Sequence, residues 1–196
     1  MASLRSAFNN ARSEMWIFLA SSVVSGLAVE VYSEESFNYL AISDWGDDKR
    51  WQRVCAAGMA TVAAAIDAKQ VFVLGDNFYP SGIAGDDSAA TAARFKRTFE
   101  DVYSAPSLAR IPFIAVAGNH DHAGNVSAQI EYTNHEQNKH GRWQFPHYWH
   151  NTTQVFEVQG RRVELETLLF DAVIMCGSSV RGKFFISFFL IRFSID

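Results

Sequence analysis

Hydrophobic positions along the chain alternate between short continuous runs and segments with helical spacing. The runs at 37–43, 71–74 and 111–117 have the length of buried strands. Between them, apolar residues recur every three or four positions over 48–69 and 91–103, which predicts amphipathic helices. This β-α-β-α-β order predicts an α/β fold of parallel strands, with functional loops at the carboxyl ends of neighbouring strands.

The first helix is expected to bury one apolar face, which comprises Trp51, Val54, Cys55, Gly58, Met59, Val62, Ala65 and Ile66. On this face we interpret Cys55 as a small buried hydrophobic residue rather than a redox group. The second helix places its apolar residues on a shared face made of Phe95, Phe99, Val102 and Tyr103, and Pro106 helps to end it.

Further along the chain, segments 154–158 and 163–174 have the character of additional strands. The stretch 184–193 is rich in phenylalanine, with Arg192 as its charged residue. Such a window has high β-propensity and would promote aggregation if exposed, so we interpret it as a buried strand.

The N-terminus has the pattern of a targeting signal. Arg5 and Arg12 precede an apolar run over 15–28, and Gly26 and Ala28 are small residues at suitable cleavage positions. We therefore predict a signal peptide over 1–28 and entry into the secretory pathway, with a secreted or lysosomal/vacuolar product. The run is too short for a stable membrane span. The alternative is a mobile or helical N-terminal extension.

Composition narrows the class of protein. The 196 residues are 48% hydrophobic and 19% charged, as in an ordinary globular domain. A net charge of −4 without a basic stripe argues against a nucleic-acid partner, although a bound metal could still attract a small anionic substrate. The two cysteines, Cys55 and Cys176, form neither a zinc-ligand spacing nor a disulfide framework.

Three predicted strand ends finish in residues that can bind metals. They are Asp44-Trp45-Gly46, Gly75-Asp76-Asn77-Phe78-Tyr79 and Gly118-Asn119-His120-Asp121-His122. A single strand-end aspartate is commonly a turn or cap residue, but three such ends on adjacent strands converge on one edge of a sheet. Hard oxygen ligands together with histidines suit iron, manganese or zinc.

At this point the sequence resembles a known family. Asp-x-Gly, Gly-Asp-Asn-x-Tyr and Gly-Asn-His-Asp, in this order, resemble the first three motif blocks of the calcineurin-like metallophosphoesterases. The position of Tyr79, three residues after Asp76, is similar to that in purple acid phosphatases. The chain resembles the small tartrate-resistant type of this family over about 38–177. Further matching blocks lie at 99–104, 117–122, 124–130 and 142–146.

This resemblance implies a two-sheet sandwich flanked by helices and a metal-dependent acid phosphatase acting on a small phosphomonoester or a phosphoprotein. It implies that Asp44 and Tyr79 bind Fe(III), with tyrosinate charge transfer giving a purple colour. Asp76 would bridge this ion to a second one, Fe(II) or Zn(II), which Asn119 would also bind. His120 would contact the substrate phosphate and assist the leaving group.

Other polar residues have ordinary interpretations. We expect surface or core roles rather than catalysis for five histidines, His122, His135, His140, His147 and His150. Asn125 and Asn151 each begin a glycosylation sequon, which agrees with secretion.

The sequence also departs from the family. The remaining family ligands are histidines in a Gly-His and a Gly-His-x-His block, and no histidine follows His150. We therefore divide the chain into the signal peptide, an N-terminal part of the phosphoesterase domain over 36–178, and an atypical hydrophobic tail over 179–196. A frameshift, a retained intron or a truncated gene model would produce such a tail.

Two hypotheses follow from this division. Either the functional gene product is a phosphatase sampled in its N-terminal half, or this is an inactive product that at most binds a metal or a partner. With the second metal site incomplete, we expect little or no phosphatase activity from the chain as written.

Overall fold

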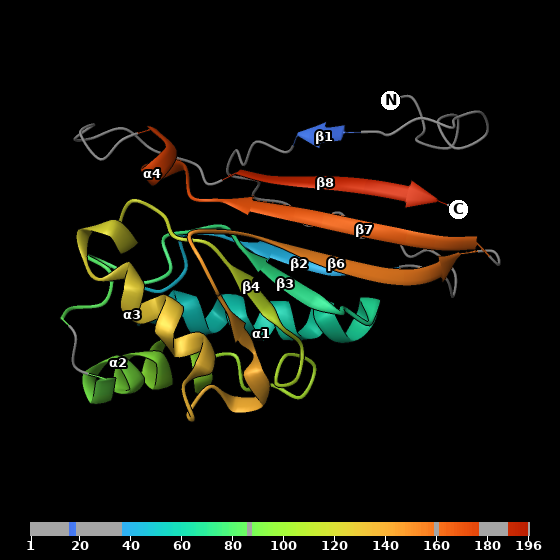
Figure 1. The fold of residues 1–196 in the computed structure, drawn as a ribbon. Coiled ribbons are helices and arrows are strands. Elements are labelled where there is room, and N and C mark those ends of the chain that lie inside the picture. The colour runs from blue at the N-terminus through green and yellow to red at the C-terminus, as the bar shows by residue number, and fades with distance from the viewer. Residues whose placement is uncertain (1–15, 19–36, 86–87, 159–160, 177–187, 196) are drawn as a thin grey trace.

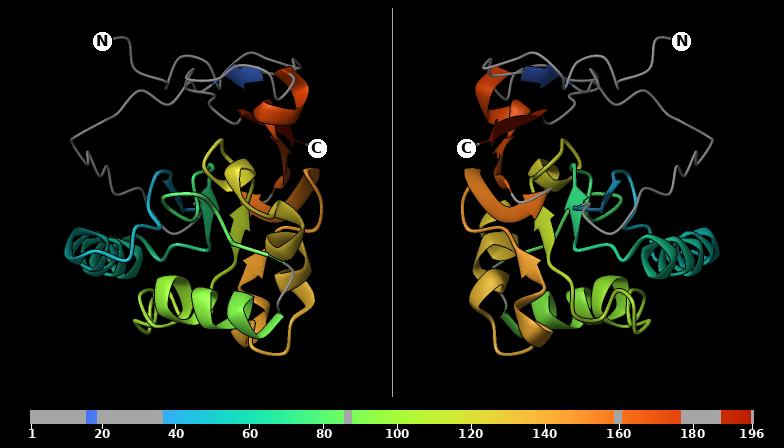
Figure 2. Two further views of the ribbon diagram at one scale, coloured as in Figure 1. Left: turned by 90° about the vertical axis from the view of Figure 1, so that its left-hand side faces the viewer. Right: turned by 90° about the vertical axis from the view of Figure 1, so that its right-hand side faces the viewer.

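Two four-stranded sheets lie one above the other, and helices cover the outer face of one of them (Figures 1 and 2). A computed structural model describes residues 16–18, 37–85, 88–158, 161–176 and 188–195. Figure 1 shows α1, α2 and α3 below the parallel sheet and the antiparallel sheet above it. This arrangement confirms the predicted α/β sandwich.

The parallel sheet has the strand order β2-β3-β4-β5. Its strands are β2 (Tyr39–Ile42), β3 (Gln70–Val73), β4 (Phe113–Ala115) and β5 (Trp143–Gln144). The helix α1 (Arg50–Ile66) connects β2 to β3, and α2 (Ser88–Phe95) continues into the π-helix η2 (Lys96–Glu100) between β3 and β4. The predicted alternation of strands and helices is therefore confirmed, and it brings three successive strand ends to one edge.

The second sheet is antiparallel, in the order β1-β8-β7-β6. Its strands are β1 (Trp16–Phe18), β6 (Trp149–Val158), β7 (Arg161–Phe170) and β8 (Phe188–Ile195). The remaining short helices are η3 (Asp121–Ala123), α3 (Val126–Glu131), η4 (Tyr132–Asn134), η5 (Lys139–Gly141) and α4 (Ala172–Cys176).

Alternate residues of the parallel strands serve two cores. Val71 and Val73 of β3 pack toward the helices, while Phe72 between them packs toward the second sheet with Leu165 and Leu169 of β7. Because side chains alternate across a strand, a strand buried on both faces has a continuous hydrophobic run. This explains why the central strands could be predicted without an alternating pattern.

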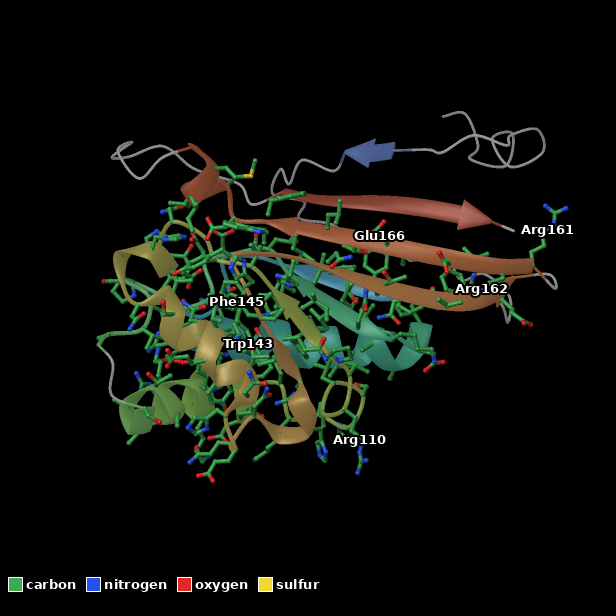
Figure 3. All side chains as sticks on the ribbon, viewed as in Figure 1. Arg110, Trp143, Phe145, Arg161, Arg162 and Glu166 are labelled. Carbon is green, nitrogen blue, oxygen red and sulfur yellow. The ribbon has the colours of Figure 1, made fainter. Side chains whose placement is uncertain are left out.

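The helix-side core is rich in aromatic rings. Phe95 and Phe99 are fully buried as predicted, and Trp143 packs edge-on to both, with centroid distances of 5.0 and 5.4 Å. Trp143 and Phe145 lie among the side chains between the parallel sheet and the helices (Figure 3). The block at 142–146 therefore contributes mainly to the core.

The predicted buried face of α1 is wrong in large part. Trp51 is 69% exposed, Val54 is 49% exposed, and Cys55 is also exposed instead of buried. The helix turns Gln52, Ala56 and Ala63 inward instead, with Met59, Ala60 and Ile66 partly buried against the core. Gln52 is drawn inward because its side-chain amide donates to the Thr98 carbonyl at 2.8 Å.

Two other expectations change at the C-terminal side. The strand predicted over 163–174 ends at Phe170, because Asp171 caps a short helix instead, accepting the N–H groups of Val173 and Ile174 at 3.0 and 3.1 Å. The stretch predicted over 184–193 is a strand from Phe188, and its first four residues lie outside the described residues. Apart from β1, the predicted signal peptide also lies outside them. Within the described ranges, no helix is long and apolar enough to span a membrane.

Candidate metal centre

Three loops leave the carboxyl ends of β2, β3 and β4 and carry the predicted site residues. The first two are joined by their backbones, since the N–H of Asp44 donates to the Gly75 carbonyl at 3.2 Å and that of Trp45 to the Asp76 carbonyl at 3.4 Å. These bonds hold the first two loops together at one edge of the sheet.

Tyr79 brings the first two aspartates together. Its hydroxyl contacts Asp44 Oδ1 at 2.8 Å and Asp76 Oδ2 at 2.9 Å. Because both carboxylate oxygens touch one phenolic oxygen, they lie within about 6 Å of each other. The two carboxylates and the phenol that were expected at one site therefore meet at the Tyr79 hydroxyl.

The third loop approaches the same carboxylate from the other side. The backbone N–H of His120 donates to Asp76 Oδ1 at 3.0 Å, and the His120 ring lies 4.3 Å from the Tyr79 ring. His120 Nδ1 is 2.6 Å from the Pro80 carbonyl oxygen. Since a carbonyl only accepts, Nδ1 carries the proton. Asn119, half-buried, is the residue before His120 at this strand end.

Both aspartates adopt an uncommon backbone conformation. Asp44 has φ 57° and Asp76 has φ 52°, in the left-handed region that most side chains avoid and that aspartate tolerates better than bulky residues. Such conformations cost about 1–3 kcal/mol and concentrate at functional sites. Their occurrence at both predicted ligands supports a functional reason for these loops.

A buried polar network lies behind the site, and the sequence analysis did not identify it. Trp45 Nε1 donates to Asn77 Oδ1 at 3.2 Å, Asn77 Nδ2 donates to Gln129 Oε1 at 3.2 Å, and Gln129 Nε2 donates to Asp121 Oδ1 at 2.9 Å. Asn77, Asp121 and Gln129 are fully buried. Because Trp45, Asn77 and Asp121 directly follow Asp44, Asp76 and His120, the network fixes the spacing of all three loops.

Asp121 is the acceptor at the centre of this network. It receives the backbone N–H groups of Gly118, Asn77 and Phe78 at 2.8 to 3.1 Å. Burial raises the pKa of Asp121 to about 6, and the hydrogen bonds oppose that rise. From its place in the Gly-Asn-His-Asp motif alone, Asp121 could be a metal ligand. Its hydrogen bonds show instead that it holds the loops in place.

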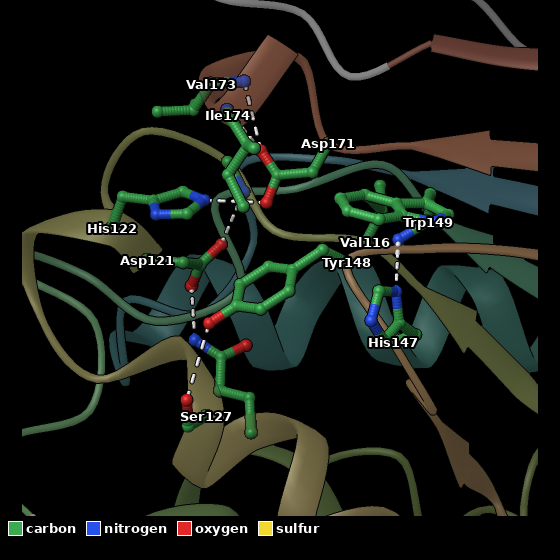
Figure 4. Close-up of polar contacts among 12 residues, drawn as sticks. Val116, Asp121, His122, Ser127, His147, Tyr148, Trp149, Asp171, Val173 and Ile174 are labelled. Carbon is green, nitrogen blue, oxygen red and sulfur yellow. Dashed lines mark hydrogen bonds and ion pairs between the residues drawn. The ribbon is translucent and has the colours of Figure 1, made fainter. Parts of the chain in front are cut away.

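His122 pairs with a buried carboxylate rather than with the central oxygens. Its Nε2 lies 2.6 Å from Oδ2 of Asp171, whose side chain is fully buried. Figure 4 shows the two side chains facing each other across the gap between the third loop and α4, with Tyr148 below them. This pair ties the loop of the parallel sheet to the end of β7, a structural role of the kind expected for His122.

The other four histidines lie away from the three loops. His135 lies 3.4 Å from the Ser88 hydroxyl, and His147 packs edge-on against Trp149. His150 Nδ1 is 3.1 Å from the His147 carbonyl oxygen, and His140 is exposed on η5. These positions agree with the surface and core roles expected for them.

The family model for calcineurin-like phosphoesterases matches residues 37–177. The chain belongs to this family.

Relatives within the family carry closely related names. The chain is 36% identical over 147 residues to tartrate-resistant acid phosphatase type 5 of Sus scrofa and 33% identical over 150 residues to that of Homo sapiens. These alignments cover 72% and 74% of this chain but 40% and 43% of the relatives. Purple acid phosphatase 7 of Arabidopsis thaliana is 36% identical over 103 residues, covering 52% of this chain and 30% of that protein. The chain thus spans about two fifths of the length of its mammalian relatives.

Among solved structures, the fold is similar to GAP50, the anchor in the inner membrane complex of Plasmodium. The TM-score is 0.58 at 23% sequence identity, and the match covers 67% of this chain and 40% of that one. At this identity the similarity concerns the fold.

Membership of the family implies a dinuclear metal centre. Over the part of the chain that the structure describes, no group of three or more His, Cys, Asp and Glu side chains is arranged to hold a metal ion. The converging donors are two aspartates and a tyrosine, a hard all-oxygen set that suits a highly charged cation. Burial first, and then the hydrogen bonds to Asp44 and Asp76, raise the pKa of the Tyr79 phenol. A proton therefore occupies the position between two carboxylates where a cation would be favoured.

Proposed function

We propose that the protein is the N-terminal part of a metal-dependent acid phosphatase that hydrolyses phosphomonoesters through a dinuclear metal centre. The observation that carries this proposal is the contact of one tyrosine hydroxyl with two aspartates from different loops. The names of the relatives, all acid phosphatases, support the reaction class.

In this proposal, Asp44 and Tyr79 hold Fe(III), Asp76 bridges to Fe(II) or Zn(II), and Asn119 binds that second ion. When bound, two such cations neutralise charge on a transferring phosphoryl group and lower the pKa of water. The chain supplies two carboxylates and a phenol whose proton must leave when an ion binds. Asp44 and Asp76 present their carboxylates from backbone in the left-handed region, which restricts the positions of these donors.

His120 is the proposed catalytic residue. Its Nδ1–H group donates to the Pro80 carbonyl, which fixes the ring and leaves Nε2 as the nitrogen that can exchange a proton. The adjacent Tyr79 ring further restricts the imidazole. A positioned imidazole that protonates the leaving group accelerates hydrolysis by about 100- to 10,000-fold.

The proposal includes a small phosphomonoester or phosphoprotein substrate and passage through the secretory pathway to a secreted or lysosomal/vacuolar location. The two sequon asparagines are the proposed glycosylation sites. Asn151 is exposed on β6, where its nitrogen donates to Glu166 Oε1 at 3.2 Å. Asn125 caps α3 by accepting the Ala128 N–H at 3.2 Å through its oxygen, and its nitrogen donates to the Gly85 carbonyl at 3.0 Å.

An experiment on two chain lengths tests the proposed activity. The 196-residue chain and a chain extended with the family's Gly-His and Gly-His-x-His blocks are assayed on a chromogenic phosphomonoester at acid pH, with metal content measured for both. We expect activity and two metal ions in the extended chain, loss of activity in its Asp76→Asn variant and a strong decrease in its His120→Ala variant.

The alternative is a protein that binds a metal or a partner without catalysis. It is favoured by the lack, among the described residues, of a third His, Cys, Asp or Glu near Asp44 and Asp76 that could complete a site. An extended chain that binds two metal ions yet remains inert would support this alternative and contradict the phosphatase.

A further inference from the structure

Arg94 on α2 reaches the backbone of two of the site loops at once. Its Nη2 donates to the Tyr79 carbonyl at 2.7 Å and to the Gly46 carbonyl at 3.3 Å. One acceptor carbonyl therefore belongs to Tyr79 itself, and the other belongs to Gly46, two residues after Asp44. Both Tyr79 and Asp44 are proposed ligands. A single guanidinium from a helix thus spans both loops.

The bonds from Arg94 reinforce a junction that the two loops already make. The N–H of Tyr79 donates to the same Gly46 carbonyl at 2.9 Å, and the guanidinium lies 5.7 Å from the centre of the Phe78 ring. The Arg94 side chain is 15% exposed, so water competes weakly for these bonds.

Asp48 holds the other side of the guanidinium. Its Oδ2 pairs with Arg94 Nη1 and also with Arg97 Nε, the latter at 3.1 Å, while its Oδ1 accepts the Thr98 hydroxyl. Asp48 itself belongs to the loop that carries Asp44. The charge pair at Nη1 therefore orients the planar guanidinium so that Nη2 faces the two carbonyl groups.

We propose that Arg94 is a positioning residue of the metal centre, which sets the distance between Tyr79 and Asp44. A ligand set needs its donors held within about 0.5 Å, and the fixed geometry of a guanidinium can impose this on two loops where the flexible amine of lysine cannot. Arg94 acts through the main chain of these loops, not on a substrate. This inference rests on the proposed metal centre for its chemical consequence, but its structural part stands on the contacts alone.

The test compares three variants of the 196-residue chain. Arg94→Met removes the fork, Arg94→Lys keeps the charge without the fork, and Arg97→Met is the matched control because Arg97 shares Asp48 yet is 56% exposed. Hydrogen exchange in peptides over 44–48 and 75–80 is measured without metal. The visible absorption per bound Fe(III) is then measured, since a tyrosinate ligand produces it.

We expect Arg94→Met to accelerate exchange in both loops by about tenfold and to weaken or shift the iron band, whereas Arg97→Met leaves both near their original values. Arg94→Lys should recover part of the exchange protection but not the band, because a lysine has a single nitrogen, whereas Arg94 pairs with Asp48 through Nη1 and holds the two carbonyl groups through Nη2. This partial rescue also covers the case in which Arg94→Met folds poorly.

Equal effects of Arg94→Met and Arg97→Met on exchange would overturn the positioning role, as would an unchanged iron band in both Arg94 variants. If the unaltered chain develops no band, the proposed metal centre fails. The exchange rates then still decide whether Arg94 holds the loops.

Discussion

At the scale of single residues, the site depends on positions where the loops approach each other closely. A side chain on Gly118 would overlap the backbone nitrogen and carboxylate of Asp76, and one on Gly46 would overlap the Asn77 carbonyl. These motif glycines allow one loop to pack closely on the next.

Gly118→Ala should therefore destabilise the protein and displace Asp76. We expect a loss of about 1–3 kcal/mol in the free energy of unfolding, because the methyl group meets backbone that cannot move easily. Gly58→Ala in α1 is the control, since nothing lies within 4 Å of the added methyl, and it should gain about 0.5–1 kcal/mol. Urea unfolding measures both. A neutral Gly118→Ala would contradict the close approach of the loops.

The burial of His150 predicts a dependence of stability on pH. Burial lowers the pKa of His150 from its ordinary 6.5, and its Nε2 is buried without a hydrogen-bond partner in the described structure. As pH falls through 6.5, the unfolded chain therefore takes up this proton before the folded chain does, and the stability contribution of the neutral imidazole is lost.

We expect His150→Gln to reduce the loss of unfolding free energy between about pH 7.5 and about pH 5.5. His140→Asn is the control, because His140 is exposed and asparagine tolerates its left-handed φ of 59°. Urea unfolding at the two pH values provides the comparison. An unchanged pH dependence in His150→Gln would show that another group is responsible.

Single residues also mark the limit of prediction from sequence. The proximity of Asp44, Asp76 and Tyr79 could be predicted because they lie in ordered motifs at neighbouring strand ends. Asn77, Asp121 and Gln129 could not, because their importance comes from mutual hydrogen bonds over 8 to 52 positions of sequence. The only local signal was that Asn77 and Asp121 follow predicted site residues immediately.

At the scale of elements, the presence of a helix was easier to predict than the face that it buries. The aromatic face of α2 and η2 was predictable because Phe95 and Phe99 have no equally apolar competitors on the opposite side. The helix α1 contains alanine and other small residues all around, so its periodicity fits two faces, and the polar Gln52 occupies the buried one. The orientation of α1 depends on a tertiary hydrogen bond from Gln52, which cannot be predicted from the sequence.

A buried ion pair connects η2 to Arg142, the residue before β5. Arg142 Nη2 lies 2.6 Å from Glu100 Oε2, both side chains are 2% exposed, and Nη1 donates to the Tyr103 carbonyl at 2.7 Å. The Arg142 guanidinium also lies 4.7 Å from the centre of the Phe99 ring. These contacts assign Arg142 to the joint between two elements.

Arg142→Met should cost about 3–5 kcal/mol in unfolding free energy, because it leaves Glu100 buried without its charge partner. Arg162→Met, which removes a surface pair with Glu164, should cost less than about 1 kcal/mol. Thermal or urea unfolding separates the two. Similar costs would show that Glu100 is solvated or protonated without its partner.

At the scale of the whole molecule, the two sheets meet at the edge where the three loops end. The pair of His122 and Asp171 joins the layers there, and the core between the sheets supports them from below. The family fold could be predicted because motifs and strand order agree. Whether the protein is a catalyst or only a binding protein could not be predicted, since the chain spans about two fifths of the length of its mammalian relatives.

Iron binding by the 196-residue chain tests the central claim most directly. The metal-free protein is titrated with Fe(III) while visible absorption and bound iron are measured, with Tyr79→Phe and, as control, Tyr148→Phe. We predict a visible band that disappears in Tyr79→Phe and remains in Tyr148→Phe, because Tyr79 contacts both proposed aspartate ligands whereas the Tyr148 hydroxyl faces Ser127. A band of equal intensity in Tyr79→Phe, or no iron bound by the unaltered chain, would contradict the account.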